Sequence, residues 1–294
     1  MPKPTVRHWA LLGYLVLAWG FAFYLIAIAV EALAPTTLVW ARLFTGALVM
    51  LVVMKWRGGS LRLGNGWLRR LVILSVTGNI FPFILIAWAE KSVPSGQVGM
   101  LMALMPITTL LIGHYFLKQE AITLLRLFGV FLGLAGVAIL VGGDILLQAP
   151  GPALMGQLAT VLATFCYAAN AIYAKRLPRY DVISVTAASL LTGSVILLPW
   201  VVLNQPAIDV VLHWHNLAAV LALGVLGTGL ATWVYFTVVN ECGPGFLSTI
   251  NYLIPGLAFL AGVFLLQEPA GWAEWGALAL IVGGVWMIQP KGTV

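Results

Sequence analysis

The sequence predicts an all-α integral membrane protein whose ten transmembrane helices form two inverted five-helix repeats. The first reason is composition, since 62% of the 294 residues are hydrophobic and 8% are charged, whereas a soluble domain carries about a quarter charged residues. The second is a succession of apolar segments of about 20 residues, the length that crosses a bilayer as a helix. The third is a motif order that occurs in both halves. Together these observations exclude a soluble fold.

Short polar connectors separate the apolar segments. The first segment follows Lys3 and Arg7, as a signal peptide would, but it is too long for a signal sequence, and Pro35 follows the candidate cleavage position. We therefore interpret it as a spanning helix. The expected spans are residues 8–30, 35–55, 67–89, 94–117, 122–143, 152–176, 181–203, 214–240, 244–267 and 270–290.

Basic residues are confined almost entirely to alternate loops, with only Lys91 on the other side. By the positive-inside rule, this asymmetry predicts that both termini of the multi-pass protein lie in the cytoplasm. The net charge of +6 does not indicate nucleic acid, because the basic residues form no single stripe with aromatic stacking platforms. The residues on the basic side are Lys3, Arg7, Lys55, Arg57, Arg62, Arg69, Arg70, Lys118, Arg126, Lys175, Arg176, Arg179 and Lys291.

An internal repeat divides the chain into two halves, residues 1–146 and 147–294. In the first half, Pro94, Pro106 and the turn Leu117-Lys118-Gln119-Glu120 occur in that order; Pro244, Pro255 and Leu265-Leu266-Gln267-Glu268 follow the same order in the second. Because each half has an odd number of spans, the second copy must be inverted in the membrane. The alternative, that these are chance helix-turn signals, stays open from the sequence alone.

Several of these residues also carry a family resemblance. Trp19-Gly20, Pro35, Arg42, Pro106, the Lys118-Gln119-Glu120 turn and the glycine-rich fifth and tenth spans resemble the drug/metabolite transporter superfamily, specifically its two-EamA-domain exporters. Within that superfamily the chain looks similar to the YddG-type exporters of aromatic amino acids. The resemblance implies an inner-membrane exporter that works by alternating access around a central cavity between the two halves.

Polar amides and aromatic side chains in the middle of spans predict where a solute binds. Amides are costly in hydrocarbon and usually face protein or a water-filled space, and aromatic rings offer flat apolar walls that suit an aromatic solute. The alternative is that each such group packs between helices. The expected substrate-binding residues are Trp19, Asn79, Phe83, Met105, Tyr167, Asn170, Thr232, Trp233, Asn251 and Tyr252.

Three prolines and one arginine are predicted to serve as hinges or gates. Pro82, Pro106 and Pro255 lie inside spans, where each removes a backbone hydrogen bond and can kink the helix. Arg42 is the sole charge well inside a span. It could hold a solute carboxylate or a helix C-terminal carbonyl, and we expect a structural or gating role. Small residues at a four-residue spacing, Gly129 and Gly133 in one span and Ala279 and Gly283 in another, predict close helix contact in a scaffold.

The sequence favours facilitated transport over other activities. It has no G-x-x-x-x-G-K-[ST] motif for ATP and no acid in the middle of the first span. An enzyme is not expected, because no H-E-x-x-H or G-x-S-x-G pattern is present. We expect a monomeric exporter of aromatic or neutral amino acids and similar metabolites, in contact with membrane lipid and without cofactor, metal or nucleic acid. The alternatives are a proton-coupled multidrug or metabolite exporter and a solute channel.

Overall fold

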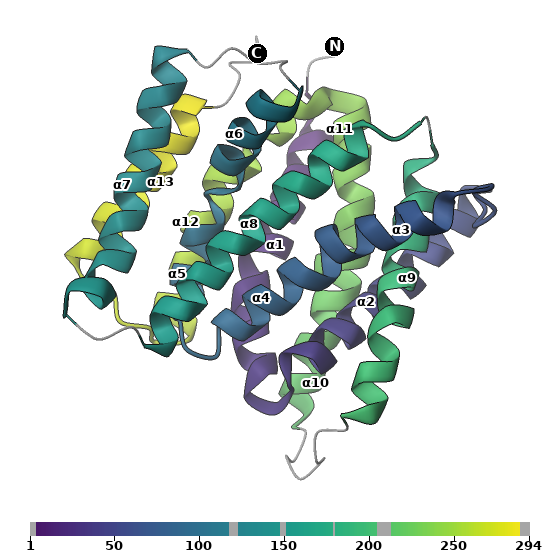
Figure 1. Ribbon diagram of the computed structural model, residues 1–294, viewed down its shortest axis with the longest axis horizontal. Coiled ribbons are helices and arrows are strands. Elements are labelled where there is room, and N and C mark those ends of the chain that lie inside the picture. The colour runs from purple at the N-terminus through teal and green to yellow at the C-terminus, as the bar shows by residue number, and fades with distance from the viewer. Residues whose placement is uncertain (1–3, 118–122, 148–150, 179, 205–212, 289–294) are drawn as a thin grey trace.

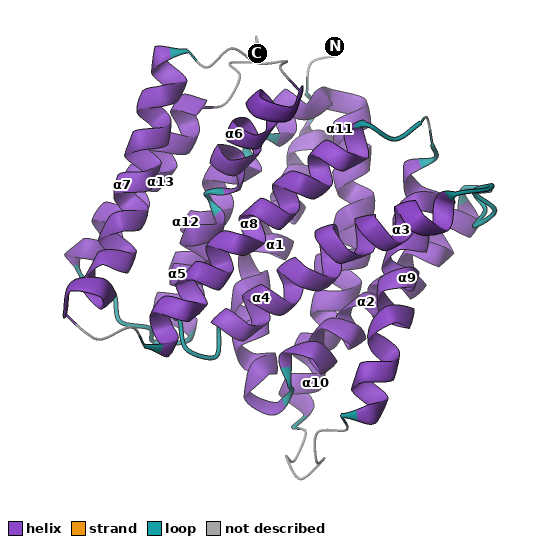
Figure 2. Cartoon of the chain, in the orientation of Figure 1, coloured by secondary structure: helices purple, strands orange, loops and turns teal. Residues whose placement is uncertain are grey.

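The structure is a computed structural model that describes residues 4–117, 123–147, 151–178, 180–204 and 213–288. Helices make up nearly all of this part of the chain, and no strand occurs within it (Figure 2). The helices lie side by side in one bundle (Figure 1). The prediction of an all-α fold is confirmed.

The first half contains five spans, two of which are divided. The third span consists of two α-helices joined by a π-helical segment, and the fourth is broken at Ala103 and Leu104. The elements are α1 (Val6–Ala32), α2 (Pro35–Trp56), α3 (Trp67–Ser75), η1 (Val76–Ile80), α4 (Phe81–Ala89), α5 (Ser95–Met102), α6 (Met105–Leu117) and α7 (Leu124–Leu147).

The second half repeats this order, and its third span again contains a π-helical segment. Across the described residues, nine helical spans are long and apolar enough to cross a membrane, and α13 is a shorter apolar helix of 17 residues. These match the ten predicted spans to within a few residues. The elements are α8 (Pro152–Lys175), α9 (Val182–Leu203), α10 (Trp214–Gly224), η2 (Val225–Leu230), α11 (Ala231–Leu247), α12 (Ile250–Leu265) and α13 (Trp272–Ile288).

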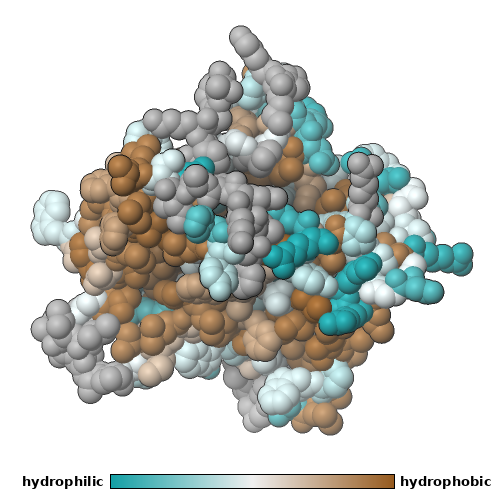
Figure 3. All heavy atoms as spheres, turned by 45° about the horizontal axis from the view of Figure 1, so that its top comes forward, coloured by the Kyte–Doolittle hydropathy of each residue, from teal (hydrophilic) through white to brown (hydrophobic). Residues whose placement is uncertain are grey.

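The beginning of α1 and the end of α13 lie at the same end of the bundle, which we call the proximal end (Figure 1). The opposite end, where α4 ends and α5 begins, is the distal end. Apolar side chains cover much of the surface over α7 and α13, whereas hydrophilic residues gather toward the proximal end (Figure 3). This distribution suits a lipid-embedded flank. Several residues used in the sequence argument lie outside the described part of the chain, namely Lys3, Lys118, Gln119, Glu120, Arg179 and Lys291.

Equivalent spans of the two halves pack against each other. Helix α2 contacts α9, α5 contacts α12, and α7 contacts α13. In each pair the two members have the same place in their own half. Contacts of this kind are expected for repeats related by a two-fold axis, and the odd number of spans gives the two halves opposite orientations.

Small residues allow α7 and α13 to approach closely. A Cβ atom at Gly284 would lie 2.5 Å from the Gly129 carbonyl oxygen and 2.6 Å from the Gly133 nitrogen. Gly129 and Gly133 therefore form the contact that their spacing predicts. Their partner is Gly284 rather than the predicted Gly283, whose Cβ would meet only the Leu132 side chain at 3.4 Å.

Gly284→Ala should therefore destabilise the protein, whereas Gly276→Ala in the same helix should not. A methyl group at Gly284 would overlap backbone atoms of α7, but at Gly276 it would meet nothing within 4 Å. Overpacking costs about 1–3 kcal/mol, and the gain in helix propensity of about 1 kcal/mol offsets part of it. Thermal unfolding of the detergent-solubilised variants measures the difference. Equal midpoints would show that α7 and α13 separate easily.

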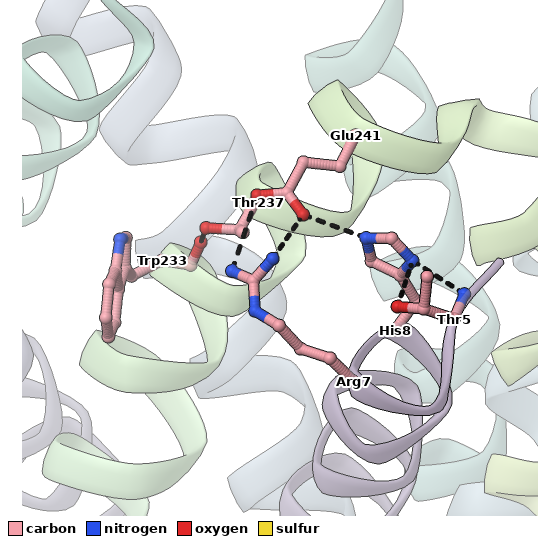
Figure 4. Close-up of polar contacts among 6 residues, drawn as sticks. All are labelled: Thr5, Arg7, His8, Trp233, Thr237 and Glu241. Atoms are coloured by element: carbon pink, nitrogen blue, oxygen red, sulfur yellow. Dashed lines mark hydrogen bonds and ion pairs between the residues drawn. The ribbon is translucent and has the colours of Figure 1, made fainter. Parts of the chain in front are cut away.

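A polar cluster at the proximal end joins α1 to α11 (Figure 4). Arg7 Nη1 lies 2.7 Å from Glu241 Oε2, and His8 Nε2 lies 2.9 Å from the same oxygen. The Thr5 backbone N–H donates to His8 Nδ1 at 2.9 Å, so the neutral ring carries its proton on Nε2 and donates to Glu241. Because the Arg7 side chain is 63% exposed, this ion pair contributes at most about 1 kcal/mol; it fixes where the two helices meet.

Candidate functional site

A cavity of about 480 Å³ lies at the centre of the bundle, between the two halves. Its walls come from α1, α2, η1, α4, α5 and α6 of the first half and from α8, η2, α11 and α12 of the second. Its lining reaches Leu247 and Ser248 at the proximal end of α11 and the start of α12. The lining also includes Ile26 and Ile86, close to the distal ends of α1 and α4, so the cavity extends along much of the bundle.

Most of the residues predicted to bind a solute line this cavity, and so do three of the four predicted hinge or gate residues. Most of these ten residues lie well inside a span, whereas Asn251 is the second residue of α12. Those that line the cavity are Trp19, Asn79, Phe83, Met105, Tyr167, Thr232 and Asn251, together with Arg42, Pro106 and Pro255.

Four predicted residues lie outside the lining. Asn170 packs against Gly78, and its Oδ1 accepts a hydrogen bond from Thr77 Oγ1 at 3.0 Å. Trp233 makes an edge-to-face contact with Trp56, with ring centroids 6.1 Å apart. Tyr252 packs on the apolar cluster of α5 and α13, and Pro82 is buried in the first turn of α4. In this conformation, packing between helices describes these four side chains better than contact with a solute.

Two π-helical segments place backbone groups and side chains at the cavity. They occupy the middle of equivalent spans, η1 in the third and η2 in the eighth. Pro82 explains η1, because it lacks the N–H that a regular helix would direct at the Gly78 carbonyl. In η2, Trp19 Nε1 donates to the Gly227 carbonyl at 3.0 Å. Segments of this kind occur frequently at functional sites, and the sequence pattern did not reveal either one.

Arg42 is the charged group of the site. Its side chain is buried, its Nε donates to Thr228 Oγ1 at 2.8 Å, and its Cζ lies 3.9 Å from the centroid of the Phe83 ring. The guanidinium therefore stacks on an aromatic face and is held by a hydroxyl group from the other half of the chain. Of the described residues around the cavity, it is the only one with a formal charge.

Aromatic side chains form two walls of the cavity. Phe83 and Tyr167 lie with ring centroids 6.5 Å apart at an interplanar angle of 61°. On the other side, Trp19 and Tyr235 lie 5.7 Å apart at 47°. Tyr235 was not among the binding residues predicted from the sequence, although it lines the cavity. Flat apolar walls of this kind accept an aromatic or bulky apolar group.

The distal end is closed by close packing of α5 against α12. A Cβ atom at Gly99 would lie 2.4 Å from the Ala258 Cβ and 3.3 Å from the Phe23 ring. Beyond this contact, the Glu268 carboxylate accepts hydrogen bonds from the backbone N–H groups of Ser95 at 2.6 Å and Gly96 at 2.9 Å. A carboxylate at the N-terminus of a helix is favourable because of the unpaired N–H groups and the helix dipole. The α12–α13 loop is thereby tied to the start of α5.

Glu90 adds a buried carboxyl group near this closure. It follows the apolar span Trp67–Ala89, and neither of its carboxylate oxygens has a hydrogen-bond partner among the described residues. Burial, reinforced by the negative charge of Glu268, raises the pKa of Glu90 well above its ordinary value, and Arg42 opposes the shift. Neither Glu90 nor Glu268 was among the binding, hinge or gate residues predicted from the sequence.

A bundle of two equivalent helical halves around a central cavity defines the class of membrane transporters built from structural repeats. The chain belongs to the EamA-like transporter family, whose model matches residues 8–142 and 154–289. The two matched segments correspond to the two five-span halves. The protein is therefore a transporter and not an enzyme.

Two of the similar proteins are named as transporters. The uncharacterized transporter YoaV of Bacillus subtilis is 24% identical, with 86% of each chain covered. The uncharacterized inner membrane transporter YedA of Escherichia coli K12 is 26% identical, with 93% of this chain and 88% of the relative covered. Protein PecM of Dickeya dadantii is 28% identical over 76% of this chain and 74% of its own length.

A solved crystal structure also shares the fold. It superposes with a TM-score of 0.70 and covers 97% of this chain and 96% of its own, at 20% sequence identity. At this identity the likeness concerns the arrangement of the helices alone.

Proposed function

We propose that this transporter exports aromatic and other neutral amino acids, and related small metabolites, by alternating access. The observation that carries the proposal is the central cavity, in which aromatic walls surround a small number of polar groups. The amides of Asn79 and Asn251 and the hydroxyl of Tyr167 line the same space and offer acceptors to an ammonium group. Ligand pockets commonly combine apolar walls with a few polar groups that fix orientation.

The proposal includes the membrane placement predicted from the basic loops. We place the protein in the inner membrane with its proximal end, and so both termini, on the cytoplasmic side. In this orientation the described conformation is closed on the outer side. The division of the chain near residue 146 and a monomeric state belong to the same proposal.

Uptake into liposomes tests the function. We expect the purified protein to give saturable uptake of labelled phenylalanine, tryptophan and threonine. Unlabelled solute inside the vesicles should stimulate this uptake, because a carrier returns faster when loaded, whereas a pore shows no such effect. Facilitated transport predicts no change when a pH gradient is imposed. Absence of flux for all three solutes would refute the amino-acid assignment.

Proton coupling is the second candidate mechanism, and one observation favours it. Glu90 is a buried carboxyl group that lies close enough to Arg42 and Glu268 to interact electrostatically with both, and buried acids in membrane proteins often serve as proton sites. Accumulation of solute driven by the pH gradient in the same liposomes would support this mechanism over facilitated transport.

A further inference from the structure

Arg42 makes no direct ion pair among the described residues, and the nearby Glu90 acts on it only at longer range. Within the described residues, no carboxylate lies within ion-pair distance of its guanidinium. Arginine remains protonated in proteins, so the cavity keeps a fixed positive charge. A buried charge inside a membrane is costly, and side chains of this kind usually mark the path of a substrate or ion.

The geometry of Arg42 leaves one edge of the guanidinium available. Its Nε is bonded to Thr228 and one face lies on the Phe83 ring, while neither terminal nitrogen has a hydrogen-bond partner among the described residues. Among the described residues, no carbonyl oxygen accepts a hydrogen bond from the Arg42 side chain, so the structure gives no support to the helix-terminus role considered from the sequence. A stacked guanidinium presents its remaining N–H groups in the ring plane, where a carboxylate can accept two parallel hydrogen bonds.

The neighbours of Arg42 indicate what else the ligand carries. Phe83 and Tyr167 lie beside it in the cavity, and no acidic side chain is found among the described lining residues. An organic cation would therefore meet an uncompensated like charge, whereas one negative charge would be neutralised. With a single arginine present, a ligand of one negative charge is matched better than a dianion.

From this arrangement we infer that Arg42 binds the carboxylate of the transported solute, and that the transporter selects monocarboxylates with a flat apolar group over amines that lack a carboxylate. This inference rests on the proposed transport function, because it assigns the cavity to the solute. It gives Arg42 a substrate-binding role in place of the predicted gating role. It also separates this protein from exporters of cationic drugs.

Three labelled probes with the same aromatic ring test the inference in liposomes that contain the full-length protein. Phenylalanine carries both charges, 3-phenylpropionate only the carboxylate and phenethylamine only the ammonium. We expect flux of the first two, and flux of phenethylamine at least about tenfold slower, because the carboxylate contributes a charge-assisted interaction. Equal flux of phenethylamine would overturn the inference while transport itself stands.

Substitutions at Arg42 provide the second test. Arg42→Gln should lower 3-phenylpropionate flux at least about tenfold, and Arg42→Lys, which keeps the charge but not the paired geometry, should lower it less. Arg62→Gln, which removes an exposed charge from the α2–α3 loop, is the matched control and should change flux less than about twofold. Unchanged flux in Arg42→Gln would overturn the inference. If Arg42→Gln does not fold, the probe comparison in the unaltered protein decides.

The outcomes also distinguish the inference from the amino-acid proposal. Flux of 3-phenylpropionate without flux of phenylalanine would refute the amino-acid proposal and support the carboxylate site. If none of the probes is carried, thermal stabilisation of the purified protein by a panel of aromatic monocarboxylates and matched amines decides the inference. Stabilisation by carboxylates that is lost in Arg42→Gln would support it, and stabilisation by none of them would overturn it.

Discussion

Gly99→Val should reduce transport at least about tenfold without preventing insertion into the membrane. Even the first carbon of a side chain at this position would lie 2.4 Å from the Ala258 Cβ, well inside contact distance, and both atoms belong to the closed distal end. Forcing α5 and α12 apart removes the closed distal state, and overpacking of this kind costs about 1–3 kcal/mol or more. Alternating access requires that state, so exchange of labelled amino acid across liposomes is the measurement.

Two further variants isolate the cause. Gly113→Val, in helix α6 of the same span, introduces the same side chain where a Cβ meets nothing within 4 Å, and it should transport normally. The double variant Gly99→Ala with Ala258→Gly moves one methyl group across the contact and should recover much of the activity lost in Gly99→Ala alone, since neighbouring substitutions are coupled. Normal flux in Gly99→Val would show that this contact is not part of a gate.

The fold could be predicted from the sequence because its dominant constraint is local. A span must be apolar for about 20 residues, and this requirement leaves a clear mark on the chain whatever the neighbouring helices are. The short α13, which is 17 residues long, was also recognised because it repeats the glycine-rich character of the fifth span. Inversion then follows from the number of spans in each half.

Part of the cavity lining could be predicted from the sequence. Trp19 and Asn79 were singled out because polar or amphipathic groups are rare in the middle of a span, and both line the cavity. The hinge role of Pro82 stays a prediction; its side chain is not among the lining residues, whereas that of Phe83 is. The π-helical turns η1 and η2 were not anticipated, because regular helical spacing assumes one period along the whole span. Contacts between the halves, such as Arg42 with Thr228, depend on packing that periodicity does not encode.

The Leu-Gln-Glu turn shows the same limit. In the sequence, this turn was evidence only of an internal repeat. The sequence pattern does not predict which backbone N–H groups the carboxylate of a loop glutamate will accept hydrogen bonds from. The structure places the Glu268 carboxylate on two N–H groups of α5, although α12 and α5 belong to different halves. In the second half, the repeated Leu-Gln-Glu turn thus supplies a contact that joins the two halves at the distal end.

Glu268→Ala should open the distal end to solvent. The substitution removes two charge-assisted hydrogen bonds to Ser95 and Gly96, and hydrogen bonds to charged groups contribute about 1.5–3 kcal/mol when buried. Because Glu268 is partly exposed, we expect a loss of about 1–3 kcal/mol for closure, which shifts the equilibrium about 5- to 150-fold. Glu268→Gln keeps one acceptor oxygen and should have a smaller effect.

Thiol labelling measures this opening. The two native cysteines, Cys166 and Cys242, are first replaced, and the substitution Ala22→Cys then places a single thiol in the cavity, which Ala22 lines. The rate at which a membrane-impermeant thiol reagent modifies this position reports how often the distal end is open. Reagent added at the distal side should react at least about fivefold faster in Glu268→Ala. The matched control is Glu274→Ala in the same loop region, since Glu274 accepts only from the nearby Gly271 N–H at 2.8 Å and ties no second helix. Equal acceleration in both variants would mean that loop flexibility, rather than the bond between the halves, governs access. An unchanged rate in Glu268→Ala would assign the closure to the Gly99 and Ala258 contact alone.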